Sequence, residues 1–279
     1  MMISGRAGLA GVVGWPIAHS RSPQLHGHWL RRYRIDGAYV PMSVSPDRVE
    51  QALRALPLLG FRGCNVTVPH KRAALTVADT ADAFAMRVGA VNTLTVGVDG
   101  ALGGSNTDGF GFLESVRTGA PTWRPPAGPA LVVGAGGAAR AIVAALIDAG
   151  VPEIRLANRT LSRGKDLAAD LGGPIVPVAW KERSAAADGA ALLVNTTTLG
   201  MDGQPPLDLE LTPLPVAAVV TDIVYTPLMT PLLSDAAARG NPVVDGLGML
   251  LHQAVPGFAT WFGVEPTVDA ALRDAVLAG

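Results

Sequence analysis

Lys71, in the stretch GCNVTVPHK at residues 63–71, is one of only three lysines in a chain with 22 lysines and arginines. An arginine stays protonated, whereas a lysine releases its proton readily when it is desolvated, so a lysine retained among arginines can serve in proton transfer. The alternative is an ordinary surface cation at the start of a helix. On residue type and context alone, the two interpretations remain equally open.

A second candidate for chemistry is the stretch ALVVGAGGAARAIVAAL at residues 130–146, in which a buried strand, a glycine-rich turn and a helix follow one another. This order is typical of a dinucleotide-binding unit, in which the pyrophosphate lies at the helix N-terminus. We expect Gly134 to allow the tight turn, Gly136 to let the backbone approach the pyrophosphate, and Ala139 to pack closely. The predicted cofactor-binding residues of this turn are Gly134, Ala135, Gly136, Gly137 and Ala138. A tight turn without a ligand is the alternative.

The end of the next expected strand indicates which dinucleotide is bound. An NAD enzyme usually has Asp or Glu there to hold the ribose diol, but this chain reads ANRTLSR. Asn158 is neutral, Arg159 and Arg163 are cationic, and Thr160 offers a hydroxyl, which together favour the 2′-phosphate of NADP. The alternative is that Thr160 caps the following helix and the arginines are solvated.

Alternating strand and helix patterns run through the chain and position these residues. In the first half, the expected strands are 9–14, 38–44, 63–68 and 91–96. The expected helices are 23–34, 46–59 and 107–117, and the segment 71–87 is expected to be mostly helical. A proline-rich segment at 120–129 then separates the halves. After it we expect strands at 130–133, 153–157, 175–178, 192–195 and 217–222, helices after the first two, and further helices at 227–239, 247–262 and 268–277.

This pattern predicts an α/β protein with two domains. Residues 1–106 would form an N-terminal β/α substrate domain, and residues 107–246 a doubly wound Rossmann domain that binds NADP. The C-terminal helices, within residues 247–279, have no strand between them and would pack back onto the first domain. The polar loop NTTTLGM at residues 195–201 would line the cofactor cleft, unless its side chains only satisfy local backbone.

Composition limits the partners. A net charge of −1 gives no general field for nucleic acid or acidic membranes, and no run of 18 apolar residues could span a membrane. The single cysteine, Cys64, excludes an intramolecular disulfide, and the five histidines show no metal-binding spacing, so we expect no metal. We therefore expect a soluble protein of a reducing cytoplasm that acts on a small molecule.

Several further motifs resemble those of a known family. They are HSRSPQLHG, GCNVTVPHK, GAVNTL, SNTDGFGF, GAGGAARA, NRT, DIVYTPLMTPLL and DGLGMLLHQA, in this order over almost the whole chain. Together they resemble the shikimate dehydrogenase family. The resemblance implies a cytoplasmic, NADP-dependent, two-domain oxidoreductase, a monomer or homodimer, that interconverts shikimate and 3-dehydroshikimate in aromatic amino acid biosynthesis.

The resemblance also implies roles for particular residues. Lys71 would be the catalytic acid and base, and Asp108 would lie across the substrate from it. The implied substrate-binding residues are Ser20, Ser22, Asn65, Thr67, Asn92, Tyr225 and Gln253. Ile223 and Gly246 would add cofactor contacts, with Gly246 beside the nicotinamide. The alternatives are a structural ion pair for Lys71 and Asp108, and capping, backbone or packing roles for the others.

One departure from the family pattern is visible, and two rival functions remain. The family usually has lysine between the two serines, where this chain has Arg21. A quinate/shikimate dehydrogenase would often use NAD, and an acidic residue at the position of Asn158 would have favoured it. A non-catalytic NADPH-binding sensor on the same fold would be expected to lack Lys71 or Asp108.

Overall fold

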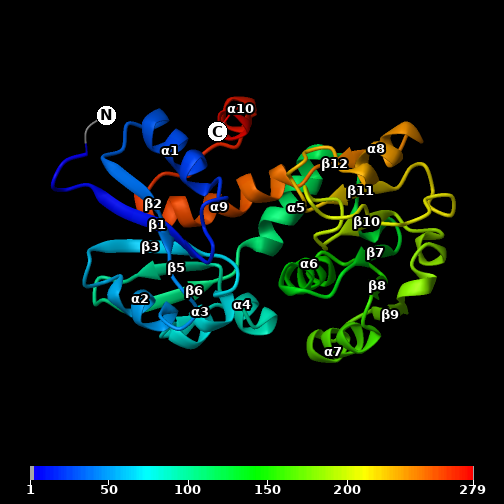
Figure 1. Cartoon of the computed structure of the whole chain (residues 1–279), viewed down its shortest axis with the longest axis horizontal. Coiled ribbons are helices and arrows are strands. Elements are labelled where there is room, and N and C mark those ends of the chain that lie inside the picture. Colours follow the sequence, from blue (N-terminus) through cyan, green and yellow to red (C-terminus); the bar gives the residue numbers. More distant parts are fainter. Residues whose placement is uncertain (1–2, 279) are drawn as a thin grey trace. The chain divides into compact units, whose positions relative to one another are not determined.

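The computed structural model describes residues 3–278, and the chain divides into two compact units. The first unit comprises the residues up to Thr107 and those from Gln253 onward, and the second comprises Asp108–His252. Each unit contains one six-stranded sheet (Figure 1). The chain therefore enters the second unit at the start of one helix and leaves it within another.

The sheet of the first unit is mixed, with the strand order β2-β1-β3-β5-β6-β4. Its strands are β1 (Gly8–Gly14), β2 (Gly37–Ser43), β3 (Phe61–Val66), β4 (Thr80–Ala81), β5 (Thr93–Val96) and β6 (Leu102–Ser105). β1 runs parallel to β2 and β3, β5 runs antiparallel to β3 and β6, and β4 runs parallel to β6. Because β1 and β3 lie inside the sheet, their residues are largely buried apolar ones, as parallel strands covered on both faces require.

Helices cover both faces of this sheet. They are α1 (Ser22–Arg32), α2 (Val49–Ala55), α3 (Lys71–Val77), α4 (Ala83–Val88), α10 (Ala270–Leu277) and the later part of α9 (Leu247–Phe262). α10 packs against α1, and two hydrogen bonds hold the C-terminal segment there. Trp29 Nε1 donates to the Thr267 carbonyl at 3.0 Å, and Arg21 donates to the Val276 carbonyl at 3.0 Å. The residue that departs from the family pattern thus helps to fasten the C-terminal helix.

An aromatic cluster between α1, β2 and α9 forms part of this core. The His26 ring is fully buried and lies flat on the Tyr39 ring, with centroids 3.8 Å apart and planes 4° apart. Trp29, Phe258 and Trp261 surround the pair. Burial lowers the pKa of His26 from 6.5 to about 3, against a smaller opposing effect of the Asn65 side chain. His26 is therefore a neutral ring in the folded protein.

This buried histidine should make the protein sensitive to acid. Below pH 6.5 the unfolded chain takes up a proton at His26, whereas the folded chain does so only near pH 3, so stability is lost as the pH falls through this window. We expect His26 to remove about 2 to 3 kcal/mol of stability between pH 7 and pH 4.5. In urea unfolding at both pH values, His26→Phe should lose less stability than the wild type. A variant of the exposed His19, His19→Asn, is the control, and equal losses in all three proteins would contradict the assignment.

The sheet of the second unit is entirely parallel, with the order β12-β11-β10-β7-β8-β9. Its strands are β7 (Ala130–Val133), β8 (Ile154–Asn158), β9 (Ile175–Ala179), β10 (Leu192–Asn195), β11 (Val219–Asp222) and β12 (Val243–Val244). In this doubly wound order the direction of winding changes between β7 and β10. Ligands of such sheets bind outside the carboxyl ends of the strands at this point, so the sheet order itself locates a candidate site.

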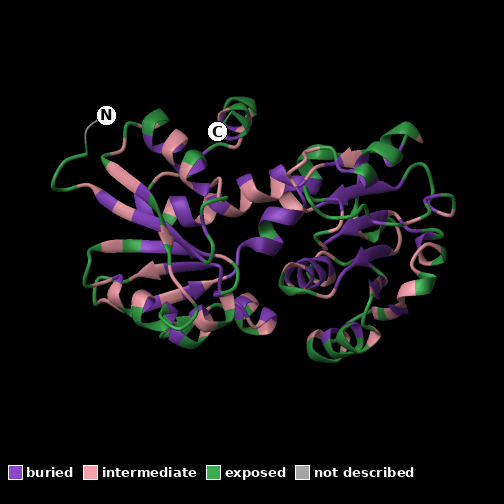
Figure 2. Cartoon of the chain, viewed as in Figure 1, coloured by how far each residue is buried: buried purple, intermediate pink, exposed green. Residues whose placement is uncertain are grey.

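The helices of the second unit lie on both faces of its sheet. They are α5 (Asp108–Gly119), α6 (Gly137–Asp148), α7 (Leu161–Leu171) and α8 (Pro231–Ala238), with short 3₁₀ turns at Pro125–Ala127, Trp180–Glu182 and Ala185–Ala187. α5 and α6 contribute Phe112 and Ile142 to the hydrophobic core on one face. α8 contributes Leu232 and Leu233 to the core on the other. The central strands are accordingly buried along their whole length (Figure 2).

The expected element pattern was incomplete in three places. The segment 71–87, expected to be mostly helical, contains two helices, α3 and α4, because the chain turns extended at Ala78 and forms β4. Asp82 begins α4 as its N-cap and accepts a hydrogen bond from Ala85 N at 2.5 Å. The strands β4, β6 and β12 were not expected. Two glycines made β6 hard to predict from the sequence. At one of them, Gly104, a Cβ would lie 2.7 Å from Val91 Cγ2, so close packing requires glycine there.

Candidate functional site

Lys71 is the first residue of α3 and is half-buried. The turn that leads to it is fixed by His70, which is buried, and whose backbone N–H donates to the Thr67 carbonyl at 2.9 Å. The His70 Nε2 atom lies 2.7 Å from the Val44 carbonyl oxygen. Since a carbonyl oxygen only accepts, His70 carries its proton on Nε2. The residue before Lys71 is thus held by hydrogen bonds of both its backbone and its side chain.

The structure brings three of the predicted substrate-binding residues together in the first unit. Asn65 at the end of β3 and Asn92 just before β5 are buried, and both amides belong to one hydrogen-bonded group. Gln253 in α9 joins this group through Asn92, whose Nδ2 donates to Gln253 Oε1 at 3.4 Å. Thr67 follows β3 and is half-buried. Neutral amides and a hydroxyl therefore gather at the end of β3 that leads to Lys71.

The two predicted carboxylate-binding serines lie at the start of α1. Ser22 is buried, Ser20 is half-buried, and Ser20 Oγ accepts a hydrogen bond from Ser22 N at 3.3 Å. The N-cap position of α1 belongs to Arg21, which makes no side-chain capping bond. Ser20 is thus one position before the N-cap, yet its hydroxyl bonds to the first N–H of α1, so its alternative role at the helix start stays open.

Asp108 is the first residue of α5 and is buried. The two residues before it are anchored in the first unit. Asn106 Nδ2 donates to the Ala90 carbonyl at 2.9 Å, and Thr107 N donates to Asn92 Oδ1 at 2.9 Å. The backbone that leads into Asp108 is therefore fixed by the same amide group that contains the predicted substrate-binding residues.

The glycine-rich turn between β7 and α6 fits a bound pyrophosphate. Gly134 has φ of +110°, and a Cβ there would lie 2.5 Å from Thr196 Oγ1, so only glycine suits the position. Beside Gly136 and Gly137 a Cβ would meet nothing within 4 Å, and the N-terminus of α6 has no side-chain cap. Ala139 is fully buried. Open backbone at an uncapped helix N-terminus is a site for an anion.

The predicted ribose-phosphate residues follow β8. Asn158 Nδ2 donates to the Thr160 carbonyl at 2.7 Å, which shapes the turn into α7. Thr160 is the N-cap residue of α7, yet its hydroxyl makes no capping bond. Arg159 and Arg163 are exposed, and neither side chain has an ion pair or hydrogen bond within residues 3–278. Two cations and a hydroxyl, which are groups suited to a phosphate, thus follow β8.

The loop after β10 is organised from within. Thr196 Oγ1 donates to the Val133 carbonyl at 2.7 Å, and Asn195 Nδ2 donates to both carboxylate oxygens of Asp222 at 3.1 and 3.0 Å. Thr197 bonds to Asn195 Oδ1 at 2.7 Å. These contacts show that the polar side chains of Asn195, Thr196 and Thr197 serve the local backbone and one another, which was the alternative considered for this loop.

Asp222 at the end of β11 is a residue that the sequence interpretation missed. It accepts hydrogen bonds from Asn195, from Val224 N at 2.9 Å and from Thr230 Oγ1 at 2.9 Å. Burial raises the pKa of Asp222, and the hydrogen bonds oppose this effect. Through these hydrogen bonds the carboxylate connects β10, the loop after β11 and the start of α8. An acidic residue within an apolar strand was the available signal.

Two predicted cofactor residues, Ile223 and Gly246, lie beside each other in the second unit. A Cβ at Gly246 would lie 2.5 Å from the carbonyl oxygens of both Ile223 and Val224, so the segment before α9 passes directly against the end of β11. Ile223 and the next predicted substrate residue, Tyr225, are half-buried. The absence of a side chain at Gly246 is therefore a packing requirement.

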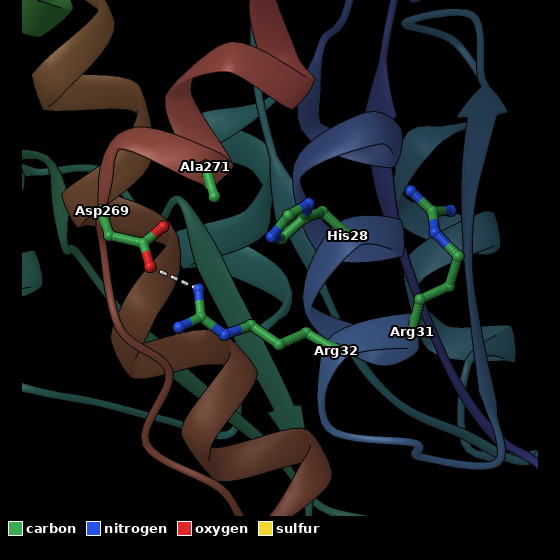
Figure 3. A pocket seen from close by; sticks show the side chains of 5 residues that line it. All are labelled: His28, Arg31, Arg32, Asp269 and Ala271. Atoms are coloured by element: carbon green, nitrogen blue, oxygen red, sulfur yellow. Dashed lines mark hydrogen bonds and ion pairs between the residues drawn. The ribbon is translucent and has the colours of Figure 1, made fainter.

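A surface hollow of about 440 Å³ lies between α1 and the start of α10 (Figure 3). It is lined by His28, Arg31, Arg32, Asp269 and Ala271. Arg32 and Asp269 form an ion pair of 2.5 Å, and burial, together with Arg31 and Arg32, lowers the pKa of His28. The hollow contains none of the predicted site residues.

Within residues 3–278 no group of His, Cys, Asp and Glu could hold a metal ion, and no helix is long and apolar enough to cross a membrane.

The parallel sheet, its glycine turn and the lysine beside buried amides define a dinucleotide-dependent dehydrogenase. Comparison with known proteins narrows this class. Residues 12–94 match the family described as shikimate dehydrogenase substrate binding domain, residues 127–198 match shikimate/quinate 5-dehydrogenase, and residues 246–275 match the shikimate 5′-dehydrogenase C-terminal domain. The chain belongs to the shikimate dehydrogenase family of NADP-dependent oxidoreductases.

Three relatives are particularly similar. The shikimate dehydrogenase (NADP(+)) of Paramagnetospirillum magneticum is 62% identical over 99% of this chain and 100% of the relative. The structure of shikimate 5-dehydrogenase from Thermus thermophilus with NADP(H) and shikimate has a TM-score of 0.87, 37% identity, and coverage of 97% and 99%. The structure of quinate dehydrogenase from Corynebacterium glutamicum with NAD has a TM-score of 0.91, 31% identity, and coverage of 98% and 99%.

Proposed function

We propose that this chain interconverts shikimate and 3-dehydroshikimate with NADP, in the biosynthesis of aromatic amino acids. The observation that carries the proposal is the position of Lys71, which begins α3 directly after the strand that bears Asn65 and leads to Thr67. An amine that exchanges protons thus follows a group of neutral amides suited to hydroxyl recognition. The identity of 62% with a relative named shikimate dehydrogenase (NADP(+)) supports the same function.

In this proposal, Lys71 is the acid and base of the reaction. During oxidation the neutral amine accepts the proton of the substrate hydroxyl, and during reduction the ammonium group returns it to the developing alkoxide. Asp108 is proposed to lie across the substrate from Lys71. Bound NADP supplies the acceptor for the hydride that leaves the carbon.

The remaining predicted residues are proposed to recognise the carboxylate and the hydroxyls of the substrate. Ser20 and Ser22 bind the carboxylate with neutral donors, which hold an anion less tightly than an arginine pair does. Thr67, Asn92, Tyr225 and Gln253 are proposed to contact the ring and its hydroxyls. Asn65 is proposed to support these residues through its hydrogen bonds to Asn92 and Thr93. A substrate that lacks one hydroxyl leaves buried groups unpaired, so discrimination of roughly 10⁴-fold is within reach of such a site.

We assign substrate binding to the first unit and NADP binding to the second. In the second unit, the turn at Gly134, Gly136 and Gly137 holds the pyrophosphate, and Arg159 and Arg163 hold the 2′-phosphate. Asn158, Thr160, Ile223 and Gly246 complete the contacts, together with Ala135 and Ala138. We further propose that the protein works in the cytoplasm as a monomer or homodimer.

Steady-state oxidation of shikimate and of quinate, each with NADP and with NAD, tests the function. We expect rapid turnover only of shikimate with NADP. Strong activity on quinate or with NAD would move the protein to the quinate dehydrogenase class. Tight binding of NADPH without any turnover would favour the sensor and refute the proposal.

The cofactor assignment predicts the effect of a charge reversal. Because an acid repels the 2′-phosphate, Arg159→Glu should raise the KM for NADP by about 10- to 100-fold and leave kcat nearly unchanged. The KM for NAD should change much less. Lys165→Glu, an equal change of charge at an exposed position of α7, is the control. If both variants raise the KM for NADP equally, the effect comes from the net charge of the protein and the assignment of Arg159 is wrong.

A further inference from the structure

A chain of buried polar side chains crosses the first unit from β2 to α9. Its members are Tyr39, Asn65, Thr93, Asn92, Thr107 and Gln253. All except Gln253 are buried. Buried hydrogen-bonding groups of this kind have defined donors and acceptors, so the direction of each bond can be deduced.

The amide of Asn92 has one possible orientation. Thr107 N lies 2.9 Å from Asn92 Oδ1, and a backbone N–H can only donate, so the oxygen must face Thr107. The other amide atom, Asn92 Nδ2, therefore is the donor, and it lies 3.1 Å from Thr107 Oγ1 and 3.4 Å from Gln253 Oε1. Since Nδ2 only donates, Gln253 turns its oxygen toward Asn92 and its Nε2 away from it.

The direction in which the Thr107 hydroxyl donates can be deduced as well. Thr107 Oγ1 lies 2.8 Å from the Gln253 carbonyl oxygen, which only accepts, so the single hydroxyl proton points there. The Thr107 oxygen is then an acceptor for Asn92 Nδ2. Gln253 is thereby held both at its backbone and at its side chain.

The orientation of Asn65 follows from the same reasoning. Its Nδ2 lies 3.4 Å from the Asn92 carbonyl oxygen and 3.2 Å from Thr93 Oγ1. The carbonyl requires a donor, so Asn65 Oδ1 must face Tyr39, whose hydroxyl lies 2.6 Å away and donates to it. Thr93, which accepts from Asn65, can then pass its own proton to Asn92 Oδ1 at 3.0 Å.

Tyr39 is the first donor in this chain of hydrogen bonds, and its hydroxyl is well fixed. It is buried and its ring is stacked on His26, so the direction of its hydroxyl is defined by packing. Burial raises the pKa of Tyr39 well above 10, which keeps the hydroxyl protonated. The Ser22 hydroxyl lies beside the same phenol oxygen.

We propose that Tyr39 is a positioning residue that holds, through Asn65 and Thr93, the Asn92 and Gln253 amides in place for the substrate. This inference rests on the proposed function, in which Asn92 and Gln253 bind the ring hydroxyls. The hydroxyl of Tyr39 donates to Asn65 Oδ1 at 2.6 Å and so restrains the amide whose Nδ2 donates to Asn92 and Thr93. Without that hydroxyl, the buried Asn65 oxygen loses this donor and the amide is held less firmly.

Tyr39→Phe tests the proposal, because it removes the hydroxyl and keeps the stacked ring. We expect kcat/KM for shikimate to fall by about 10-fold and the KM for NADP to stay unchanged. Tyr33→Phe removes a hydroxyl that bonds to Thr267 outside this chain of residues, and should leave both parameters as in the wild type. A lower melting temperature of Tyr39→Phe with unchanged kcat/KM would mean a merely structural role and would overturn the proposal.

A double-mutant cycle with Gln253→Ala examines the route of the effect. If Tyr39 acts through the amides, the loss caused by Tyr39→Phe should shrink to about threefold or less once Gln253 is absent. A full tenfold loss in both backgrounds would show that the residues act independently and would overturn the proposed route.

Nuclear magnetic resonance of the side-chain amides in the full chain, without substrate, separates this inference from the proposed function. The Asn92 and Gln253 amide signals should shift in Tyr39→Phe and stay in place in Tyr33→Phe. Unchanged signals would overturn the inference. Shifted signals in a protein that does not oxidise shikimate would support the positioning role and refute only the substrate assignment.

Discussion

Replacing Lys71 with alanine should lower kcat for shikimate oxidation by roughly 10²-fold or more, because the substrate hydroxyl then loses its proton acceptor. The KM for NADP should change little, since the predicted cofactor residues belong to the second unit. Lys71→Arg should be nearly as inactive as Lys71→Ala. Arginine restores the positive charge but does not exchange the proton, so this pair of variants separates acid–base chemistry from charge.

Steady-state and single-turnover rates of these variants provide the measurement. Lys165→Ala, the removal of an exposed lysine from α7, is the matched control and should keep the wild-type rate. If Lys71→Arg retained most of the wild-type kcat, the role of Lys71 would be electrostatic. A structural ion pair would then explain the residue better than catalysis does.

Gly63→Ala should destabilise the protein by about 3 kcal/mol or more, the largest effect expected for a small substitution. Gly63 has φ of +154°, and a Cβ there would lie 2.0 Å from the Leu94 carbonyl oxygen and 2.2 Å from Trp261 Nε1. These two atoms are themselves hydrogen-bonded at 3.0 Å. An added methyl group must therefore displace α9 from β5 and leave a buried donor and acceptor unpaired.

Gly60→Ala is the matched control for this effect. Gly60 also has a positive φ, +73°, but a Cβ there would meet nothing within 4 Å, so only backbone strain of about 1 to 2 kcal/mol is expected. Urea unfolding of both variants at pH 7 measures the difference. Equal destabilisation would mean that the contact with Trp261 adds nothing, and that Gly63 is needed only for its backbone conformation.

Local patterns along the chain determined much of the fold in advance. The strand, turn and helix around Gly134 were predictable because a buried apolar run, a positive φ and a helix start are all local requirements. The helix Leu247–Phe262 was predicted with its observed bounds despite its internal Pro256. The interruption of the helical segment after Lys71 was not predicted, because Thr80 and Ala81 are extended through pairing with the distant strand β6.

Residue types and motif resemblance also indicated the candidate residues, Lys71, Asp108 and the neutral amides among them. By itself the sequence determined which groups are available for chemistry, which dinucleotide the end of β8 favours, and where strands and helices alternate. Only the tertiary structure decided which amide oxygen faces which donor, that Tyr39 lies behind Asn65, and that Asp222 ties three segments together. The physical reason is that these bonds join residues up to 161 positions apart, and their direction depends on backbone groups that only the folded chain brings within reach.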